Sequence, residues 1–368
     1  MVKGPATVIV HGSCHVLGSD VSDKTISVRA GKALPFELTG RCKLYAKLGN
    51  GGRMWTADPF TAGTTLWRNI ARKIFVLIND LKTITVILIG DVDTGKSTLS
   101  TYLVNMALAY ELKPCIVDAD IGQGDLAPPT AIGAAAPSKQ IVDLRDVCAN
   151  LFEFVGSISP AGIEHFMTMK LRSIVERSSQ LGNIIIINTD GYVRNSGIAY
   201  KLHIVEMLKP DIIVCLGENL ALFNILKSRS WRVLRAPASS QTYKSRMERI
   251  GRRFDQFSRH IGNRKKNIDI KQIEFVYMDK IISPLEKLQS STILQSELAD
   301  IEGMFVGLGI KNEVIGFGII ESITDDSMYI QTNVLDFDTV YLSKIRLSKD
   351  IKRRDQVQKI QDPEDQVR

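Results

Sequence analysis

Cysteine is scarce in this sequence, with five residues in 368 and no two of them close together along the chain. Structural zinc sites and disulfide frameworks use cysteines at short, regular spacings, so both are excluded as a basis for the fold. Long apolar runs are also missing, and no stretch approaches the length of a membrane span. The first residues lack the apolar core of a signal peptide. These absences predict a soluble, cytoplasmic protein that has no membrane partner.

A phosphate-binding loop lies between a predicted strand at 84–89 and a predicted helix at 98–110. The residues between them match the pattern Gly, four residues, Gly, Lys, Ser/Thr, and a chance glycine-rich turn is the alternative. We expect backbone amides to surround the phosphates, Lys96 to reach the β- and γ-phosphates, and Ser97 to bind Mg²⁺. The predicted nucleotide-binding residues are Gly90, Asp91, Val92, Asp93, Thr94, Gly95, Lys96, Ser97 and Thr98.

The chain divides into four predicted parts. Short β-favouring stretches broken by Gly and Pro predict a small β-rich domain over residues 1–75. Strands alternating with helices over 76–265 predict an α/β P-loop NTPase core, with a mostly parallel sheet between layers of helices. The pattern becomes β-rich again over 266–347, and residues 348–368 form a charged tail. The predicted fold is therefore an α/β core flanked by small β-rich domains.

Two acidic residues follow one another at the end of the strand predicted over 115–118. Asp118 ends that strand, and Asp120 comes two residues later. Ligands in open α/β sheets bind beyond the carboxyl ends of the strands, so we expect both carboxylates beside the phosphate-binding loop. A carboxylate there can hold Mg²⁺ or accept a proton from an attacking hydroxyl. Gln123 is a candidate for orienting the nucleophile, and turn or capping roles are the alternative for all three residues.

The strand predicted over 184–188 leads into Thr189, Asp190, Gly191 and Tyr192. Guanine-specific P-loop proteins carry Asn-Lys-x-Asp at such a point, and here Thr189 replaces the lysine. Tyr192 is well placed to stack on a base, an interaction that contributes about 1–3 kcal/mol. A half-buried loop tyrosine without a ligand is the competing interpretation.

Positive charge is concentrated between residues 227 and 266. Thirteen Lys or Arg and two acids give this stretch a net charge of +11, whereas the whole chain carries +7. Such a patch favours a polyanionic partner, and a solvated basic helix face is the alternative. Within it, "SRMERIGRRFDQF" predicts a lid helix whose arginines could stabilise charge on a transferring phosphoryl group. The lid candidates are Arg246, Arg249, Arg252 and Arg253.

Together, these motifs resemble those of the polynucleotide 5′-hydroxyl kinases that act in RNA processing. That family includes the kinase subunit of the pre-mRNA cleavage factor, nucleolar ribosomal-RNA kinases and archaeal relatives. Its P-loop, Gly-x-x-Asp-x-Gly-Lys-Ser-Thr, is matched at 90–98, and its Asp-x-Asp-x-Gly-Gln motif at 118–123. Its Thr-x-Gly-Trp-Val motif is matched at 189–193, with Tyr192 in place of the tryptophan. The resemblance covers nearly the whole chain and suggests an archaeal member.

The resemblance implies an ATP- and Mg²⁺-dependent kinase that phosphorylates the 5′-hydroxyl end of RNA, with DNA as a further candidate substrate. RNA-processing proteins are then expected partners. Asp120 becomes the candidate for activating the hydroxyl, and Tyr192 the candidate for stacking on a nucleotide near the 5′ end. The implied catalytic residues are Lys96, Asp120, Arg249 and Arg253. The implied Mg²⁺ ligands are Ser97, Asp118 and Asp120. The implied substrate-binding residues are Gln123, Thr189, Gly191, Tyr192, Arg246 and Arg252.

Two rival functions remain open. The first is a catalytically silent, ATP-bound scaffold in an RNA-processing complex, and the intact Lys96, Ser97 and Asp120 count against it. The second is a P-loop enzyme or GTPase of another class that acts on a small molecule or a metallochaperone client. The missing guanine motif and the basic lid helix weigh against that reading.

Overall fold

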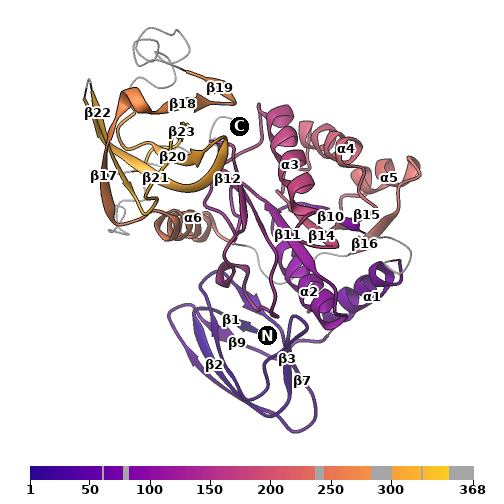
Figure 1. Ribbon diagram of the computed structural model, residues 1–368. Coiled ribbons are helices and arrows are strands. Elements are labelled where there is room, and N and C mark those ends of the chain that lie inside the picture. The colour runs from indigo at the N-terminus through magenta and orange to yellow at the C-terminus, as the bar shows by residue number, and fades with distance from the viewer. Residues whose placement is uncertain (60–61, 78–82, 237–243, 283–300, 325, 348–368) are drawn as a thin grey trace. The chain divides into compact units, whose positions relative to one another are not determined.

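The computed structural model describes residues 1–59, 62–77, 83–236, 244–282, 301–324 and 326–347 (Figure 1). The chain forms two compact units. The first comprises residues 1–118, 134–148 and 175–249, and the second comprises 119–133, 149–174 and the residues from 250 onward. None of the helices in these described ranges is both long enough and apolar enough to cross a membrane.

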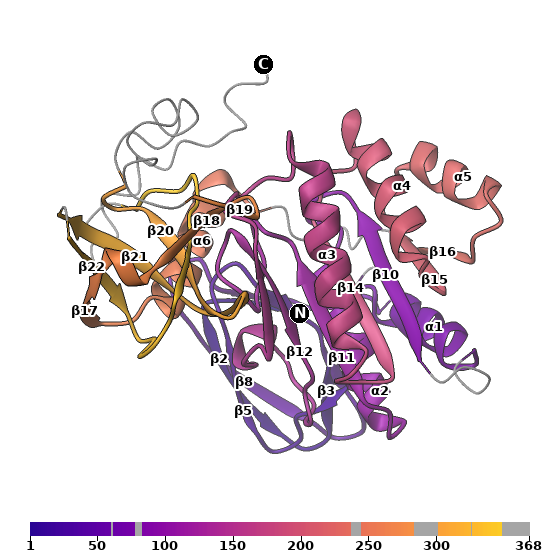
Figure 2. The ribbon, with the colours of Figure 1, turned by 45° about the horizontal axis from the view of Figure 1, so that its top comes forward.

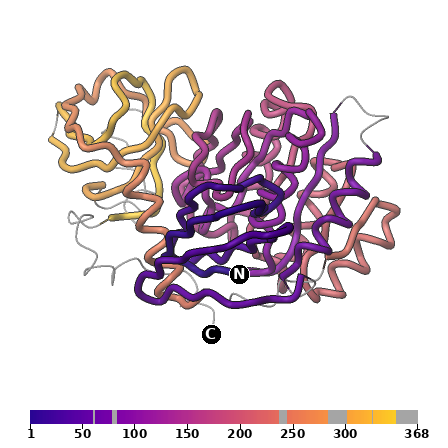
Figure 3. The backbone as a smooth tube through the Cα atoms, turned by 90° about the horizontal axis from the view of Figure 1, so that it is seen from below, coloured from indigo at the N-terminus to yellow at the C-terminus, as the bar shows by residue number. Residues whose placement is uncertain are grey.

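Short antiparallel strands form the beginning of the first unit, drawn in indigo in Figure 3. In the sheet β5-β2-β8, which contains the longest of these strands, β2 is central. Along β2 the buried residues Ala6, Val8 and Val10 alternate with exposed ones, as expected of a half-buried strand. This confirms the β-rich start of the chain. The strands are β1 (Val2–Lys3), β2 (Ala6–His11), β3 (Cys14–Val16), β4 (Ser19–Asp20), β5 (Thr25–Val28), β6 (Ala33–Leu34), β7 (Phe36–Leu38), β8 (Lys43–Leu48) and β9 (Arg53–Met54).

A largely parallel sheet forms the centre of the first unit, with the strand order β11-β14-β10-β15-β16. The pairs β10–β14, β10–β15 and β15–β16 are parallel. Every residue of β11, β14 and β15 is buried, which is typical of strands covered on both faces. The predicted α/β fold class is therefore confirmed. These strands are β10 (Ile84–Gly90), β11 (Pro114–Ala119), β14 (Ile184–Thr189), β15 (Ile212–Leu216) and β16 (Val233–Ala236).

Helices cover both faces of this sheet. Figures 1 and 2 show α1 and α2 on one side of β10 and β15, and α4 and α5 on the other. The apolar periodicity of the sequence also predicts a helix over 67–81; in the structure this helix begins at Thr64 and ends at Phe75, and residues 78–82 lie outside the described part of the chain. The helices that begin in this unit are α1 (Thr64–Phe75), α2 (Lys96–Ala109), α4 (Ser196–Leu208), α5 (Leu220–Ser228) and the predicted lid helix α6 (Arg246–His260).

The second unit contains an antiparallel-rich sheet with the order β17-β22-β21-β20-β23-β18-β19. Its core includes an aromatic cluster in which Phe305 and Phe317 stack at 5.8 Å and Phe257 of α6 packs against Phe305 at 4.8 Å. This confirms the β-rich C-terminal region. The strands are β17 (Arg264–Asp269), β18 (Glu274–Tyr277), β19 (Lys280–Ile281), β20 (Phe305–Ile310), β21 (Glu313–Ile323), β22 (Ser327–Thr332) and β23 (Thr339–Tyr341).

Three further elements come from the middle of the chain: β12 (Ala131–Ala135), β13 (Leu151–Phe154) and α3 (Glu164–Ser178). The sequence patterns predict no strand at β12 or β13. They also predict none at β17 of the second unit's sheet, whose first residues belong to the basic stretch. The division at residues 75, 265 and 347 stays a prediction. The charged tail at 348–368 lies outside the described residues.

Candidate functional site

The phosphate-binding loop folds around its own lysine. Gly90 ends β10 where a Cβ atom would lie 2.4 Å from the Leu216 carbonyl oxygen, so only glycine fits. Gly95 precedes α2 with a φ of +93°, a conformation that glycine adopts without strain. Inside the loop, the buried Lys96 Nζ donates to the carbonyl oxygens of Gly90 and Asp91, both at 2.8 Å. The turn after β10, the start of α2 and the Lys96 side chain therefore lie together, as expected of a P-loop.

Three oxygen-bearing side chains gather beside the first turn of α2. Asn188, at the carboxyl end of β14, donates from Nδ2 to Ser97 Oγ at 3.1 Å and to Asp118 Oδ1 at 2.9 Å. Its own Oδ1 is buried and has no hydrogen-bond partner among the described residues. Hard divalent cations such as Mg²⁺ prefer hydroxyl, carboxylate and amide oxygens, so this donor set fits such an ion. The sequence had suggested Ser97 and Asp118 but gave Asn188 no role.

The lid arginine Arg249 reaches the phosphate-binding loop. Its Nη2 donates to Asp93 Oδ2 at 2.8 Å, and the backbone N–H of Lys244 donates to the same oxygen at 3.0 Å. Burial alone would raise the pKa of Asp93, but the Lys244 N–H and the positive charges of Lys244 and Arg249 outweigh it and lower the pKa. A capping box in which Ser245 and Glu248 exchange hydrogen bonds fixes the start of α6 at this point.

The Asp93 contact makes a testable contribution to stability. Because folding lowers the pKa of Asp93, its carboxylate stabilises the fold above its ordinary pKa of 3.8, and this effect fades as the pH falls below that value. We expect Asp93→Asn to lower the free energy of unfolding by about 1–3 kcal/mol at pH 6. Urea unfolding at several pH values should show that this difference shrinks below pH 4.

A matched control is Asp326→Asn, which makes the same chemical change in an exposed pair with Lys271. Since exposed pairs contribute little, this variant should unfold much like the parent protein. An Asp93→Asn penalty that is the same at pH 3 and pH 6 would contradict the electrostatic explanation.

The loop of residues 190–195 between β14 and α4, the clasp loop, carries the predicted base-stacking residue. Tyr192 is half-buried, its N–H donates to Asp190 Oδ1 at 2.8 Å, and its hydroxyl is hydrogen-bonded to Ser196. Gly191 presses on the phosphate-binding loop, since a Cβ there would lie 2.5 Å from Val92 Cγ1. The clasp loop is thus built against the phosphate-binding loop.

Thr189 precedes the clasp loop and is buried. Its hydroxyl donates to the Leu88 carbonyl at 2.8 Å, inside the sheet. This contact ties the end of β14 to β10. A substrate contact by Thr189 stays a prediction.

A buried ion pair that the sequence does not predict fixes the clasp loop to α4. Lys201 of α4 is fully buried and donates to Asp190 Oδ1 at 2.8 Å, and the Tyr200 hydroxyl donates to Asp190 Oδ2 at 3.2 Å. The ammonium also lies 4.7 Å from the centre of the Tyr200 ring. A lysine on an apolar helix gives no local sign of its partner eleven residues away, so only the fold reveals this contact.

In the second unit, Asp120 and Gln123 share one tight turn. Asp120 Oδ1 accepts hydrogen bonds from the backbone N–H groups of Gln123 at 2.9 Å and Gly122 at 3.2 Å. The Asp120 carboxylate is therefore held in a defined orientation while its side chain stays partly exposed. The turn then continues into Asp125, which is almost completely buried.

The second half of α6 binds this turn. Arg252 donates to the Asp125 carboxylate, and both side chains are buried. Gln256 Nε2 donates to the carbonyl oxygens of Gly124 and Asp125, each at 3.0 Å. Arg252 therefore has a positioning role in the turn, and its predicted contact with substrate stays a prediction. Arg253 is buried in the same unit, whereas Arg246 at the start of α6 is exposed.

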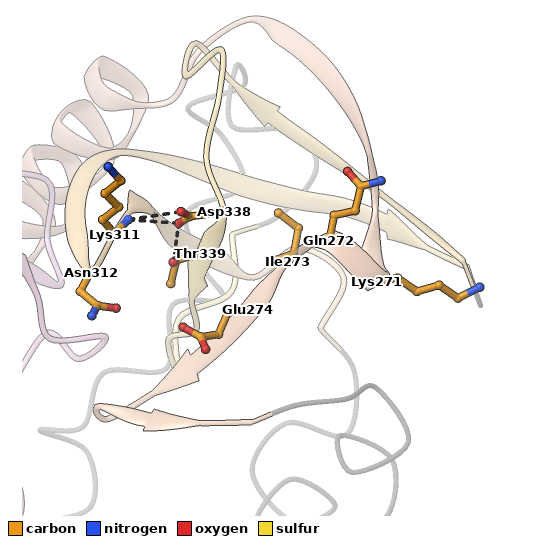
Figure 4. A pocket seen from close by; sticks show the side chains of 8 residues that line it. All are labelled: Lys271, Gln272, Ile273, Glu274, Lys311, Asn312, Asp338 and Thr339. Atoms are coloured by element: carbon orange, nitrogen blue, oxygen red, sulfur yellow. Dashed lines mark hydrogen bonds between the residues drawn. The ribbon is translucent and has the colours of Figure 1, made fainter.

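A surface pocket in the second unit contains none of the predicted site residues (Figure 4). Its volume is about 410 Å³. Asp338 accepts hydrogen bonds at its rim from the Lys311 N–H at 3.3 Å and the Thr339 hydroxyl at 2.7 Å. The pocket is therefore separate from the chemistry predicted from the sequence motifs.

Comparison with known proteins gives two kinds of relatives. The family described as the mRNA cleavage and polyadenylation factor CLP1 P-loop matches residues 90–261. A polyribonucleotide 5′-hydroxyl-kinase of Pyrococcus abyssi is 30% identical over 71% of this chain and 74% of its own length. One from Pyrococcus horikoshii is 27% identical over 72% and 73%. The structure of a Clp1p–Pcf11p complex aligns with a TM-score of 0.72 and 14% identity, covering 94% of each chain, which supports the same fold.

Proposed function

Because the chain belongs to the family of CLP1-type P-loop proteins and polyribonucleotide 5′-hydroxyl-kinases, we propose that it transfers the γ-phosphate of ATP to the 5′-hydroxyl end of RNA. The observation that carries the proposal is the cluster of Ser97, Asp118 and Asn188 beside Lys96. It unites a lysine for phosphate with oxygen ligands for a metal. DNA ends remain a further candidate substrate, and the structural similarity to a Clp1p that was solved in complex with Pcf11p supports protein partners for this chain.

Phosphate binding falls to the P-loop. Its backbone N–H groups and the amino end of α2 present partial positive charge to the triphosphate. Lys96 exchanges the Gly90 and Asp91 carbonyls for phosphate oxygens, which carry more negative charge. In this position Lys96 stabilises the charge that develops on the transferring group.

Ser97 and Asp118 would hold Mg²⁺, directly or through water. Asn188 Oδ1, which has no hydrogen-bond partner in the described part of the chain, is a further candidate ligand. The ion supplies charge neutralisation at the β- and γ-phosphate oxygens when it is bound. The Asn188 amide keeps the Ser97 hydroxyl and the Asp118 carboxylate in fixed positions. Asp120 is the other metal ligand that the resemblance implies, and this role stays a proposal.

Asp120 is proposed to orient the RNA 5′-hydroxyl and to accept its proton. The N–H groups of Gly122 and Gln123 bind one carboxylate oxygen and so fix the orientation of the group that would accept the proton. Gln123 is proposed to orient the same nucleophile. Arg249 and Arg253 are proposed to stabilise the transition state, and Arg246 and Arg252 to support substrate binding.

A transfer assay tests the proposal. The protein is mixed with γ-labelled ATP, Mg²⁺ and short RNA oligonucleotides that carry either a 5′-hydroxyl or a 5′-phosphate. Label should appear only on the 5′-hydroxyl RNA, and a DNA oligonucleotide of the same sequence ranks the second substrate. Bound ATP with no label on any oligonucleotide would reject the kinase and favour the silent scaffold. Preference for GTP would favour a P-loop enzyme of another class.

Tyr192 gives a prediction about RNA affinity. We expect Tyr192→Ala to raise the KM for RNA about 5- to 100-fold, because one base–aromatic stack contributes about 1–3 kcal/mol. The KM for ATP should stay unchanged. Steady-state transfer kinetics with varied RNA measure both constants.

The matched variant is Tyr192→Phe, which keeps the ring and removes only the hydroxyl that bonds to Ser196. It should bind RNA nearly as well as the parent, and Tyr192→Trp should bind at least as well. Equal losses in the Ala and Phe variants would assign the effect to the hydroxyl and reject stacking.

A further inference from the structure

The clasp loop presents a second side chain, Arg194, to which the proposed function gives no role. Its side chain is 80% exposed, and its guanidinium binds Asp91 of the phosphate-binding loop. Nε donates to Asp91 Oδ2 at 2.8 Å, and Nη2 lies 2.6 Å from the same oxygen. Among the described residues, Asp91 is the only hydrogen-bond partner of the Arg194 guanidinium. Arg194 therefore keeps unused N–H donors in solvent while one edge of the guanidinium is fixed.

Asp91, which binds Arg194, belongs to the phosphate-binding loop. The Asp91 carbonyl oxygen accepts from Lys96 Nζ at 2.8 Å, so one residue joins the P-loop lysine to Arg194. Gly191 seats the clasp loop on Val92 without a gap. Two independent contacts thus hold the clasp loop, with Tyr192 and Arg194 in it, next to the place where phosphoryl transfer is proposed.

Stability does not explain the pair. An exposed ion pair contributes little to folding and is screened by salt. An arginine that must be held in one orientation but left exposed is better explained by a ligand. Guanidinium groups match phosphate geometry with paired N–H donors, and a partner on one edge fixes the direction of the other edge.

We propose that Arg194 binds the first internucleotide phosphate of the RNA, an inference that rests on the proposed function. An RNA whose 5′-hydroxyl faces the transferring phosphate has its first phosphodiester only one nucleotide further along. Tyr192, two residues before Arg194, is the residue proposed to stack on a nucleotide at the same end. The clasp loop would then hold a base through Tyr192 and the adjoining phosphate through Arg194. Substrates would need at least one phosphodiester.

Binding experiments with modified RNA test the proposal without relying on transfer. Fluorescence anisotropy measures the Kd of 5′-hydroxyl RNA that is unmodified, or that carries a neutral methylphosphonate at the first linkage or at the fifth. In the parent protein, the first-linkage change should weaken binding about 10- to 100-fold, as expected for a lost charge-assisted hydrogen bond. Arg194→Ala should weaken binding of unmodified RNA by a similar factor and remove the difference between the first-linkage and unmodified RNAs.

The control variant is Arg41→Ala, an exposed arginine that precedes β8 in the same unit. In Arg41→Ala, the methylphosphonate at the first linkage should weaken binding as much as in the parent protein. In Arg194→Lys it should weaken binding by a smaller factor. The proposal is wrong if Arg194→Ala keeps the parent's ratio of Kd values between the first-linkage RNA and the unmodified RNA. It is also wrong if the variant weakens binding of a non-transferable ATP analogue but not binding of RNA. Because transfer is measured separately, loss of the kinase activity and loss of this phosphate contact would be told apart.

Discussion

Lys96→Ala should reduce the rate of phosphoryl transfer by about 10²–10³-fold. This is the typical loss when one donor to the developing transition-state charge is removed. The side chain is buried in the loop, where two carbonyl groups hold its ammonium beside the place of the phosphates. The effect should fall mainly on kcat, since the contact is strongest in the transition state. Single-turnover transfer to 5′-hydroxyl RNA measures it directly.

Lys73→Ala provides the matched control, because Lys73 is an exposed lysine in the last turn of α1. It should transfer at the parent rate. Since Lys96→Ala removes the hydrogen bonds that Lys96 donates to the Gly90 and Asp91 carbonyls, the fold of this variant must be checked by thermal unfolding. A folded Lys96→Ala protein that transfers within fivefold of the parent rate would contradict the assigned role.

Asp190→Ala should lower the free energy of unfolding by about 3–5 kcal/mol, the usual cost of removing one partner of a buried ion pair. Lys201 is fully buried, so it would lose this carboxylate without gaining water. The Tyr192 N–H and the Tyr200 hydroxyl would lose the same acceptor. Urea unfolding at neutral pH measures the change, and the clasp loop should lose RNA affinity as well.

Glu206→Ala is the comparison, since Glu206 pairs with Arg229 at the surface. It should change stability by less than about 1 kcal/mol. The double variant Asp190→Leu with Lys201→Met should recover much of the loss, because apolar replacement of a buried pair is often tolerated. If Asp190→Ala costs no more than Glu206→Ala, the buried pair is not a stabilising feature.

Local pattern was enough to predict the strands β10, β11 and β14 and the P-loop. The β-branched run at β10 and the Gly-Lys-Ser step that follows it are short-range signals, and the structure has both where they were expected. β17 was missed because its sequence, RKKNID, is dominated by charge. It pairs with β22 along one edge only, where charged side chains are tolerated.

The candidate site was predictable only where its residues share a motif. Asn188 lies 70 residues from Asp118, and Arg249 lies 156 residues from Asp93, so no spacing in the sequence links either pair. The strand order places β14 next to β11 and so brings Asn188 to Asp118, whereas Arg249 reaches Asp93 from the start of α6. The roles of Asp120, Gln123 and the lid arginines stay predictions from family motifs until transfer is measured.

Part of the positive charge in the basic stretch at 227–266 is paired with carboxylates in the structure. Lys244 and Arg249 bind Asp93, and Arg252 binds Asp125. Lys265 pairs with Glu321, and Lys266 with Asp336. Arg229 also pairs with Glu206, so at least six of the thirteen basic side chains already have a carboxylate partner among the described residues. Fewer counterions would therefore be released from RNA than a charge of +11 implies. For single strands the salt dependence has a slope of about −0.7 per neutralised phosphate, so RNA affinity should fall less steeply with ionic strength than +11 predicts.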